Sequence, residues 1–453
     1  MKYSEPKDQM LYQKMKDFTV AAVNLLNDLF KNGKMIPVVN RYQFYISNGK
    51  FMRGKRYLYP LFERFVFANQ DLLMELSEFK KCMEYCRQSE IFQKHLFRLS
   101  GLMEFSKENV ESYLENEFLF LLLAKLLHSV EGLRYDEDEF DKLYCQIESY
   151  LESQFMHLAA LVPIKNFELK GQEVILDEDA KVSSIESREL NLLIDSGNLN
   201  LEIIDTVPPY ALKINFFAEK GLQVEYQIPF KKIQKVFCTF RMFKKGALWF
   251  DHIYCIPLSW EPTKPLSFFI NQSAQGSKYI LEEKEGTILL QIWKNFNDLK
   301  TENRFIEIAI EKFDNAVFRQ RAEDKLVDYI SALEALFLGA DEKAELEYRL
   351  ALRLATFIGE SSNERVFIRN ILKAAYAQRS CIVHGKKLKI TQINGKKYSI
   401  EDLSVHLEDY TRRSLQKFIK MAARKINHEE LLDRLDDALL KFPRTPFSFE
   451  YSS

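Results

Sequence analysis

Residues that interrupt regular structure are scarce in this chain, which has 15 glycines and 12 prolines among its 453 residues. Internal repeats and low-complexity tracts are absent from the sequence as well. The chain is therefore neither a repeat protein nor a low-complexity one. Hydrophobic residues make up 47% of it and charged residues 28%, a balance typical of globular proteins.

Long hydrophobic runs are also missing. The longest strongly apolar run, FLFLLLA at 118–124, is broken by Lys125 and is far too short to span a bilayer. The first ten residues, MKYSEPKDQM, are polar and do not resemble a signal peptide. We therefore expect a protein that does not enter the membrane.

Cysteine is sparse, and its spacing does not suggest a metal site. Among six scattered cysteines, Cys82 and Cys86 lie one helical turn apart, but no second pair of thiols or histidines completes a zinc site. Reduced, mostly buried thiols are typical of the cytoplasm, which is the predicted location. We expect no metal and no other cofactor.

An excess of either charge is absent too, since 64 basic and 65 acidic residues give a net charge of −1. A nucleic-acid-binding surface would have to be a local patch. Residues 229–250 contain six basic residues, no acid and interleaved aromatics, and residues 48–60 are a second basic stretch. Such stretches suit single-stranded nucleic acid, or else their aromatics are core and their lysines protect an edge strand.

The pattern of apolar residues along the sequence changes twice, which predicts a multidomain α+β protein. Residues 1–160 show apolar residues at helical spacing and are expected to be helical. Residues 161–300 contain short runs rich in β-branched and aromatic residues, KVFCTFRMF among them, separated by turn signals, and are expected to form a β-rich domain.

Helical texture returns in residues 301–430, and residues 431–453 are expected to form a loose tail. Because amphipathic helices bury their apolar stripes against one another, these segments predict a helical bundle. Leu326, Ile330, Leu333 and Phe337 mark one stripe, and Ser399 with Asp402 has capping-box spacing. The four segments that stand out are 323–339, 345–359, 363–385 and 399–426.

Two polar residues stand out in the third of these segments, AAYAQRSCIVHGKK at 374–387. Arg379 falls on or beside the apolar stripe, where a guanidinium is costly unless it is paired or faces a polar cleft. His384 precedes Gly385, the expected C′ residue of the helix. In one ideal helix the two side chains would lie about 140° and about 7.5 Å apart. The plainer interpretation is a surface arginine and a histidine that complements the helix dipole.

A basic segment follows the glycine. Residues 385–400 hold five lysines and no acid, and Asn394-Gly395 predicts a two-residue hairpin turn. Such a hairpin beside His384 would suit a phosphate backbone. The lysines expected to bind RNA are Lys386, Lys387 and Lys389.

The run YAQRSCIVHGKK resembles the R-x4-6-H signature of the HEPN superfamily, and it looks most like the Apea-like branch, whose third helix typically ends in R-S-x-(I/V)-V-H-G. The segments YISALEALFLG and YRLALRLATFIG resemble the first two helices of that branch. The resemblance covers roughly residues 320–425, about a quarter of the chain. It implies a C-terminal bundle of four or five helices.

The resemblance also implies a function. Many members are metal-independent endoribonucleases in which two domains pair, and the RNA 2′-hydroxyl attacks the adjacent phosphate to give a 2′,3′-cyclic phosphate. Carried over by position, Arg379 would stabilise the phosphorane charge, His384 would transfer protons, and Ser380 would be a supporting polar residue. RNA, a second copy of the chain, and a protein trigger or antitoxin are the expected partners.

Many members belong to antiviral or toxin–antitoxin systems, whereas others are inactive and bind RNA, nucleotides or partners. A non-catalytic bundle that dimerises or binds RNA or nucleotide is therefore the alternative. Two further residues have open roles. Glu334 would either orient Arg379 or be an acid on the bundle rim. Arg353, with Arg349 one turn before it, would either extend a basic cleft that binds RNA or lie on a solvated face.

Overall fold

The computed structural model describes residues 6–100, 117–220, 227–258, 260, 265–299, 303–339, 342, 345–388, 391–422 and 427–440. The chain forms two compact units and passes between them more than once. Unit 1 consists of residues 1–163, 177–230 and 252–269, and unit 2 consists of residues 164–176, 231–251 and 270–453. The predicted α+β class is confirmed, with N-terminal helices, a central antiparallel sheet and C-terminal helices.

The N-terminal part of unit 1 is mostly helical, as the apolar spacing predicts. In the first helix, α1, Leu11, Met15, Phe18, Ala22 and Leu26 are all fully buried at three- or four-residue spacing. Asp8 caps this helix by accepting a hydrogen bond from the Leu11 backbone N–H at 2.8 Å. The helices are α1 (Gln9–Lys31), α2 (Phe62–Phe67), α3 (Gln70–Met74), α4 (Ser77–Gln88), α5 (Glu90–Ser100), α7 (Leu119–Ser129) and α8 (Glu137–Glu152).

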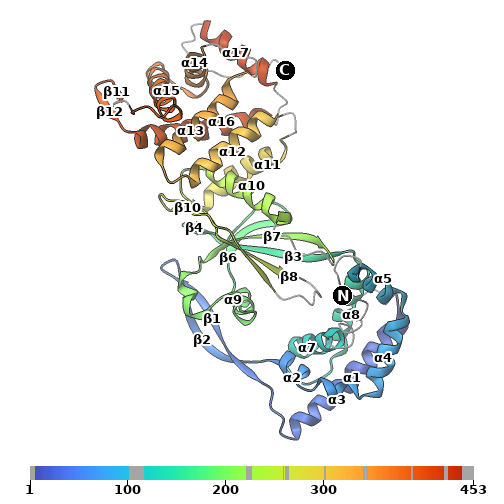
Figure 1. Ribbon diagram of the computed structural model, residues 1–453. Helices are drawn as coiled ribbons and strands as arrows, with labels where there is room; N and C mark the ends of the chain where they lie inside the picture. The colour runs from blue at the N-terminus through green and yellow to red at the C-terminus, as the bar shows by residue number, and fades with distance from the viewer. Residues whose placement is uncertain are drawn as a thin grey trace. The chain divides into compact units, whose positions relative to one another are not determined.

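A long hairpin interrupts these helices, and the expectation that residues 1–160 are helical throughout is wrong here. Strands β1 (Val38–Ser47) and β2 (Lys50–Pro60) pair antiparallel over almost their full length (Figure 1). The turn residues Asn48 and Gly49 have φ of 51° and 70°. Two positive φ values define a type I′ turn, whose twist matches that of paired strands.

The centre of the chain contains a six-stranded sheet with the strand order β5-β6-β7-β3-β8-β9. Its middle strand β3 pairs antiparallel with β7 and with β8. Helix α9 (Ser187–Asp195) and the 3-10 helix η2 (Leu201–Thr206) follow β6. The strands are β3 (Phe155–Pro163), β5 (Glu173–Ile175), β6 (Ala180–Ser184), β7 (Tyr210–Glu219), β8 (His252–Pro257) and β9 (Leu266–Phe269).

One predicted strand of this middle region is a helix instead. The run KVFCTFRMF lies within α10 (Gln227–Phe243). Its aromatic and β-branched residues resemble a strand in composition, but Ile233, Val236, Phe237 and Phe240 are buried at three- and four-residue spacing. That spacing is helical, so the buried aromatics of residues 229–250 belong to a core and do not form a nucleic-acid-binding strand.

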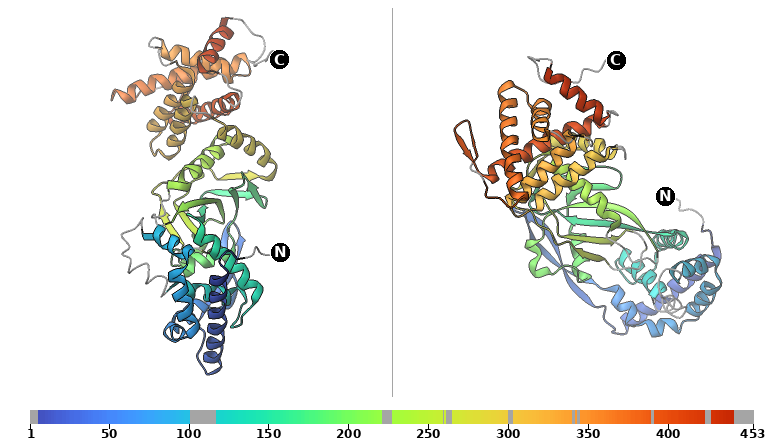
Figure 2. Two further views of the ribbon diagram at one scale, coloured as in Figure 1. Left: turned by 90° about the vertical axis from the view of Figure 1, so that its right-hand side faces the viewer. Right: turned by 45° about the horizontal axis from the view of Figure 1, so that its top comes forward.

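Unit 2 is a helical bundle with a small parallel strand pair, β4 (Phe167–Lys170) and β10 (Tyr279–Glu282). Figures 1 and 2 show the bundle helices packed side by side in yellow to red. They share one continuous hydrophobic core. The helices after α10 are α11 (Gly286–Asn297), α12 (Arg304–Phe318), α13 (Ala322–Phe337), α14 (Leu346–Ile358), α15 (Ser362–Val383), α16 (Ile400–Ala422) and α17 (His428–Leu440).

Several details of the bundle agree with the sequence. The stripe of α13 is fully buried at Leu326, Ile330, Leu333 and Phe337. Ser399 and Asp402 form the reciprocal hydrogen bonds of a capping box, at 2.9 and 3.1 Å. The expected loose tail at 431–453 is wrong in its first part, because α17 continues to residue 440, and the rest of that tail lies outside the described residues.

All six cysteines are free thiols, and all but Cys145 are buried. In the part of the chain that the structure describes, no helix is long and apolar enough to cross a membrane.

Candidate functional site

Arg379 lies on α15 at the boundary between the buried face of the helix and its exposed face. Its neighbours on the helix, Ala375 and Gln378, are buried, whereas 29% of the Arg379 side chain is exposed. The guanidinium Nη2 donates a hydrogen bond to Glu334 Oε2 on α13 at 3.2 Å. The structure thus brings Glu334 to Arg379, which is the contact that an orienting carboxylate requires.

Tyr376 completes this arrangement, although the sequence did not single it out. Its hydroxyl donates to Glu334 Oε1 at 3.0 Å, and its ring centroid lies 5.5 Å from the Arg379 guanidinium carbon. Burial and the Glu334 carboxylate both raise the pKa of Tyr376, so the phenol remains a donor. Tyr376 precedes Arg379 by one helical turn, and this spacing could have indicated a shared partner.

The Arg379 guanidinium retains an unsatisfied group. Its Nε–H is buried and has no hydrogen-bond acceptor among the described residues. An unpaired buried donor costs free energy, on the order of 1–3 kcal/mol. The buried Nε–H groups of Arg41, Arg241 and Arg369 also have no acceptor among the described residues, so this feature does not distinguish Arg379.

His384 occupies the end of the same helix. The backbone N–H of Lys386 donates to Cys381 O at 2.8 Å, and that of Gly385 donates to Ile382 O at 3.2 Å. With Gly385 at a φ of 62°, these bonds form a Schellman motif, and the expected C′ glycine is confirmed. The His384 side chain is exposed at this terminus and forms no hydrogen bond or ion pair with another described side chain.

The structure keeps Arg379 and His384 apart. Helix α15 is continuous up to Val383, and His384 is its C-cap residue, with φ of −95° and ψ of 8°. The separation of five residues therefore retains the offset of an ordinary helix, about 140° around the axis. No hydrogen bond joins the two side chains in the described part of the bundle. Ser380, between them, is exposed.

The basic hairpin predicted after His384 is present. Strands β11 (Thr391–Ile393) and β12 (Lys396–Tyr398) pair antiparallel, and Asn394 and Gly395 have φ of 50° and 79°. Gln378 Nε2 donates to Thr391 Oγ1 at 2.9 Å, which ties the hairpin to α15. The two-residue type I′ turn is confirmed.

Several lysines of this segment face solvent. Lys386, Lys387, Lys396 and Lys397 are exposed, and none of them forms an ion pair among the described residues, although the charge of Lys396 helps to lower the pKa of Asp402. Lys389 lies outside the described residues. A hollow of about 470 Å³ adjoins the hairpin, with Gln378, Leu388, Lys397, Tyr398 and Ser399 in its lining.

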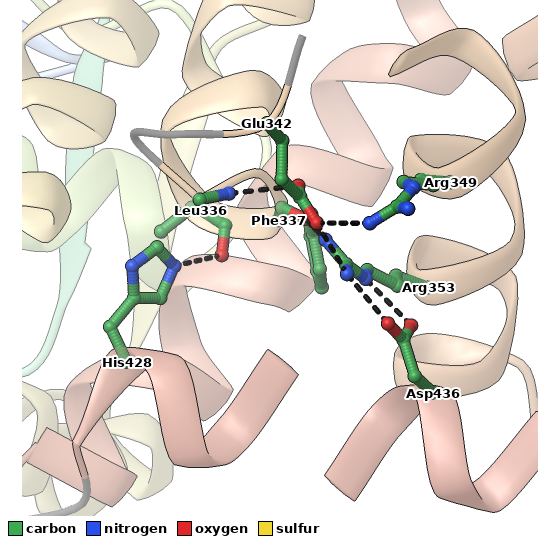
Figure 3. Close-up of polar contacts among 8 residues, drawn as sticks. Leu336, Phe337, Glu342, Arg349, Arg353, His428 and Asp436 are labelled. Carbon is green, nitrogen blue, oxygen red and sulfur yellow. Dashed lines mark hydrogen bonds and ion pairs between the residues drawn. The ribbon is translucent and has the colours of Figure 1, made fainter. Parts of the chain in front are cut away.

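Arg353 is not available to bind RNA, and that prediction is wrong. Its side chain is 3% exposed. Figure 3 shows its guanidinium between Glu342 and Asp436 of α17, with each carboxylate oxygen 2.7–2.9 Å from a guanidinium nitrogen. Arg353 also donates to Phe337 O at 2.8 Å, so all its polar capacity is used within the bundle.

The surroundings of Arg353 form an ionic cluster around its buried guanidinium, and the side chains of Arg349 and Asp436 at its rim are 42% and 45% exposed. Arg349 donates to Glu342 at 2.6 Å. Glu342 lies before the start of α14, so this pair is not formed along one helix face. Burial opposes ionisation of Glu342, but hydrogen bonds from Arg353, the Gly339 N–H and Arg349 outweigh it and lower the pKa of Glu342 to about 2. The cluster holds α14 to α17 and has a structural role.

Neither a protein-family model, a curated protein nor a solved structure matches the chain. Within the described residues, no group of three or more histidine, cysteine, aspartate or glutamate side chains could hold a metal ion. The end of α15 and its surroundings present a guanidinium, an imidazole, a carboxylate and several ammonium groups.

Proposed function

We propose that the C-terminal bundle is a metal-independent endoribonuclease of HEPN type. The observation that carries the proposal is the end of α15. There, Glu334 and Tyr376 hold the part-buried Arg379, and an exposed His384 begins a lysine-rich segment without acids. Guanidinium, imidazole and ammonium groups on one helix end are the set that phosphodiester cleavage without a metal requires.

RNA supplies its own nucleophile, the 2′-hydroxyl. The protein therefore has to stabilise the negative charge that develops on the phosphate and to transfer protons. The 2′-hydroxyl attacks the adjacent phosphorus, the bond to the 5′-oxygen breaks, and the products carry a 2′,3′-cyclic phosphate and a 5′-hydroxyl. Arg379 stabilises the additional negative charge of the phosphorane, because a guanidinium stays charged and binds two oxygens at once. His384 moves a proton, because an imidazole nitrogen can either accept or donate one.

A homodimer follows from the separation of these two groups. Because one helix directs Arg379 and His384 about 140° apart, a single chain places only one of them well at a given phosphate. A second bundle related by a two-fold axis would supply the other group. Lys386 and Lys387 would then hold the flanking backbone phosphates, with Ser380 a further polar contact.

A non-catalytic bundle is the second candidate, and one observation favours it. The Arg379 guanidinium is already paired with Glu334, which offsets its charge. A site of this kind could bind an RNA phosphate or a nucleotide without cleaving it. In either case, a bacterial antiviral or toxin effector that responds to a protein trigger or antitoxin is the biological role we propose.

The test is cleavage of a fluorophore–quencher RNA by the full chain with and without EDTA. We expect cleavage to be unaffected by EDTA and to fall by about 10²–10⁴-fold in His384→Ala, the usual range for loss of an acid–base group. Arg434→Ala, an exposed residue of α17, is the control and should retain full activity. Dependence on a divalent ion, or full activity in His384→Ala, would overturn the proposal. RNA binding without product supports the second candidate.

A further inference from the structure

The β1–β2 hairpin in unit 1 is unusually basic, and the bundle chemistry does not involve it. Residues 29–62 contain seven lysines or arginines and no acid. Five of these cations lie on the two strands, and only Arg41 among those five pairs with a carboxylate, that of Asp195, in the described part of the chain. Lys50 and Lys55 are exposed and have no partner among the described residues.

One face of the hairpin is anchored. Phe51 is 2% exposed and packs in a hydrophobic cluster with Leu161 and Leu190, and Phe44 packs beside it. A two-stranded ribbon is barely stable by itself, so these contacts hold it in shape. On the opposite face, Tyr59 stacks on His128, and the part of that face nearer the turn is left exposed.

The edge of β1 is also covered. Ser187 Oγ of α9 accepts a hydrogen bond from the Phe44 backbone N–H at 2.9 Å, and Asn191 Nδ2 donates to Tyr42 O at 3.0 Å. These bonds satisfy backbone groups that would otherwise pair with another strand. A ligand therefore meets side chains of the ribbon rather than this edge.

The opposite face of the hairpin exposes aromatic and apolar side chains to solvent. Along a strand, successive residues point to alternate faces, so Tyr45 and its cross-strand partner Met52 lie opposite the anchored phenylalanines. Tyr45 is 53% exposed, Met52 is 43% exposed, and Tyr57, on the same face, is 37% exposed. Tyr57 pairs with Arg41, four residues from Tyr45, which places the two tyrosines about 13 Å apart along the ribbon.

A bulge increases the number of cations on this face. The pairing shifts between Tyr42 and Phe44, so that Gly54 and Lys55 both oppose Gln43. A side chain at position 54 would meet Gln43 O at 2.9 Å, which explains the glycine. The bulge thereby places Lys55 between the two exposed tyrosines, with Lys50 beyond them at the turn.

We infer that this face of the β1–β2 hairpin binds single-stranded RNA. Exposed tyrosines offer stacking surfaces for unpaired bases, and unpaired lysines between and beside them match the phosphates. A double strand would hide its bases from the tyrosines, so the arrangement favours a single strand. The choice of RNA over DNA rests on the proposed nuclease function, whereas the surface is built from unit 1 alone.

The test is fluorescence anisotropy of a labelled 20-nucleotide oligo(U) with the full-length protein. Lys50→Gln with Lys55→Gln should weaken binding about tenfold and reduce the slope of log Kd against log salt by about 1.4. Tyr45→Ala with Tyr57→Ala should also weaken it about tenfold. The control, Lys80→Gln with Lys81→Gln, removes the same charge from exposed positions of α4 and should change little.

Three outcomes would overturn the inference. The first is unchanged binding in the lysine pair or the tyrosine pair, with thermal unfolding showing both proteins folded. The second is equal or tighter binding of duplex RNA or of single-stranded DNA of matching sequence. The third is equal displacement of the RNA by polyglutamate, which would indicate an acidic protein partner. Anisotropy measures binding and not cleavage, so a chain that binds the oligonucleotide through the hairpin but yields no product would sink the nuclease proposal and leave this inference standing.

Discussion

Two hairpins of this chain have the same dipeptide, Asn-Gly, in their turns, but they pack against the rest of the protein in different ways. Asn48-Gly49 joins the ten- and eleven-residue strands β1 and β2, and Asn394-Gly395 joins β11 and β12, which have three residues each. All four turn residues have positive φ. The long hairpin buries Phe51 in a core, whereas the short one is tied to α15 by Gln378 and Thr391.

An Asn-Gly turn determines that two strands pair, but it does not determine the role of the hairpin. That role depends on the residues that the strand side chains contact. In the long hairpin, aromatic residues alternate with cations over a face, which suits binding. In the short hairpin, lysines lie beside a histidine and an arginine, which suits chemistry. We therefore expect damage to the two hairpins to have different consequences.

The largest expected difference concerns catalysis. Arg379→Lys retains the charge beside the short hairpin but loses the planar fork, and it should lower kcat about 10²-fold or more. Lys50→Gln with Lys55→Gln should raise KM and leave kcat within about twofold. Steady-state cleavage of a fluorogenic RNA measures both constants. If the double lysine variant lost as much kcat as Arg379→Lys, the assignment of binding to the long hairpin and of chemistry to the short one would be wrong.

The second-largest expected difference is in the free energy of unfolding that a core substitution in each hairpin removes. Phe51→Ala removes a fully buried ring from the long hairpin and should lower the free energy of unfolding by about 3–5 kcal/mol. Ile393→Val in the short hairpin removes one methylene and should cost about 1 kcal/mol. Urea denaturation followed by tyrosine and tryptophan fluorescence would measure both. Equal losses would mean that Phe51 does not anchor the ribbon.

Acid should weaken the long hairpin's surroundings most, although burial also lowers the pKa of His406, whose ring lies 5.9 Å from that of Tyr398 in β12. His128 stacks on Tyr59 of β2, and burial, with a smaller effect of Arg41, lowers the pKa of His128 to about 4. Between pH 6.5 and 4 the unfolded chain binds a proton that the folded chain does not. The free energy of unfolding should therefore fall as the pH drops through this window, by about 2 kcal/mol at pH 5.

His128→Gln checks the origin of that acid sensitivity. Because glutamine does not titrate, the variant should show a flatter stability profile than the natural chain between pH 6.5 and 5. Thermal unfolding at several pH values gives both profiles. Parallel profiles would assign the effect to other groups.

The smallest expected effect is at the turns themselves. Gly49→Ala and Gly395→Ala each force a side chain into a positive φ and should cost about 1 kcal/mol. Gly286→Ala, at the start of α11 with open space around it, should be neutral or slightly stabilising. Gly49→Ala should weaken RNA binding more than Gly395→Ala does, and the reverse order in an anisotropy titration would contradict the assignment.

Features set by neighbours along the chain were predicted well from the sequence. The α13 stripe, the Gly385 cap, the capping box at Ser399 and the Asn394-Gly395 turn all depend on residues within one or two turns of each other. The Asn48-Gly49 turn carried the same signal. It was missed because the helical spacing on both sides dominated the interpretation of that region.

Features set by distant partners were predicted poorly. The composition of α10 suggested a strand, and only burial at Ile233, Val236 and Phe240 showed the helical period. Arg353 looked like a surface cation because one of its partners, Asp436, is 83 residues away. Tyr376 gained its meaning from Glu334, 42 residues earlier. The one-turn spacing of Tyr376 and Arg379 could indicate a shared partner, but no local pattern shows which distant residue that partner is.

The most direct test of the central claim uses the substrate rather than the protein. An RNA with one preferred cleavage site is compared with the same RNA carrying a single 2′-deoxy nucleotide on the 5′ side of that site, both in EDTA. Attack by the 2′-hydroxyl predicts that the unmodified RNA yields a 2′,3′-cyclic phosphate by mass spectrometry and that the deoxy position is not cut. Cleavage at the deoxy position, or a product with a linear phosphate from the start, would contradict the account.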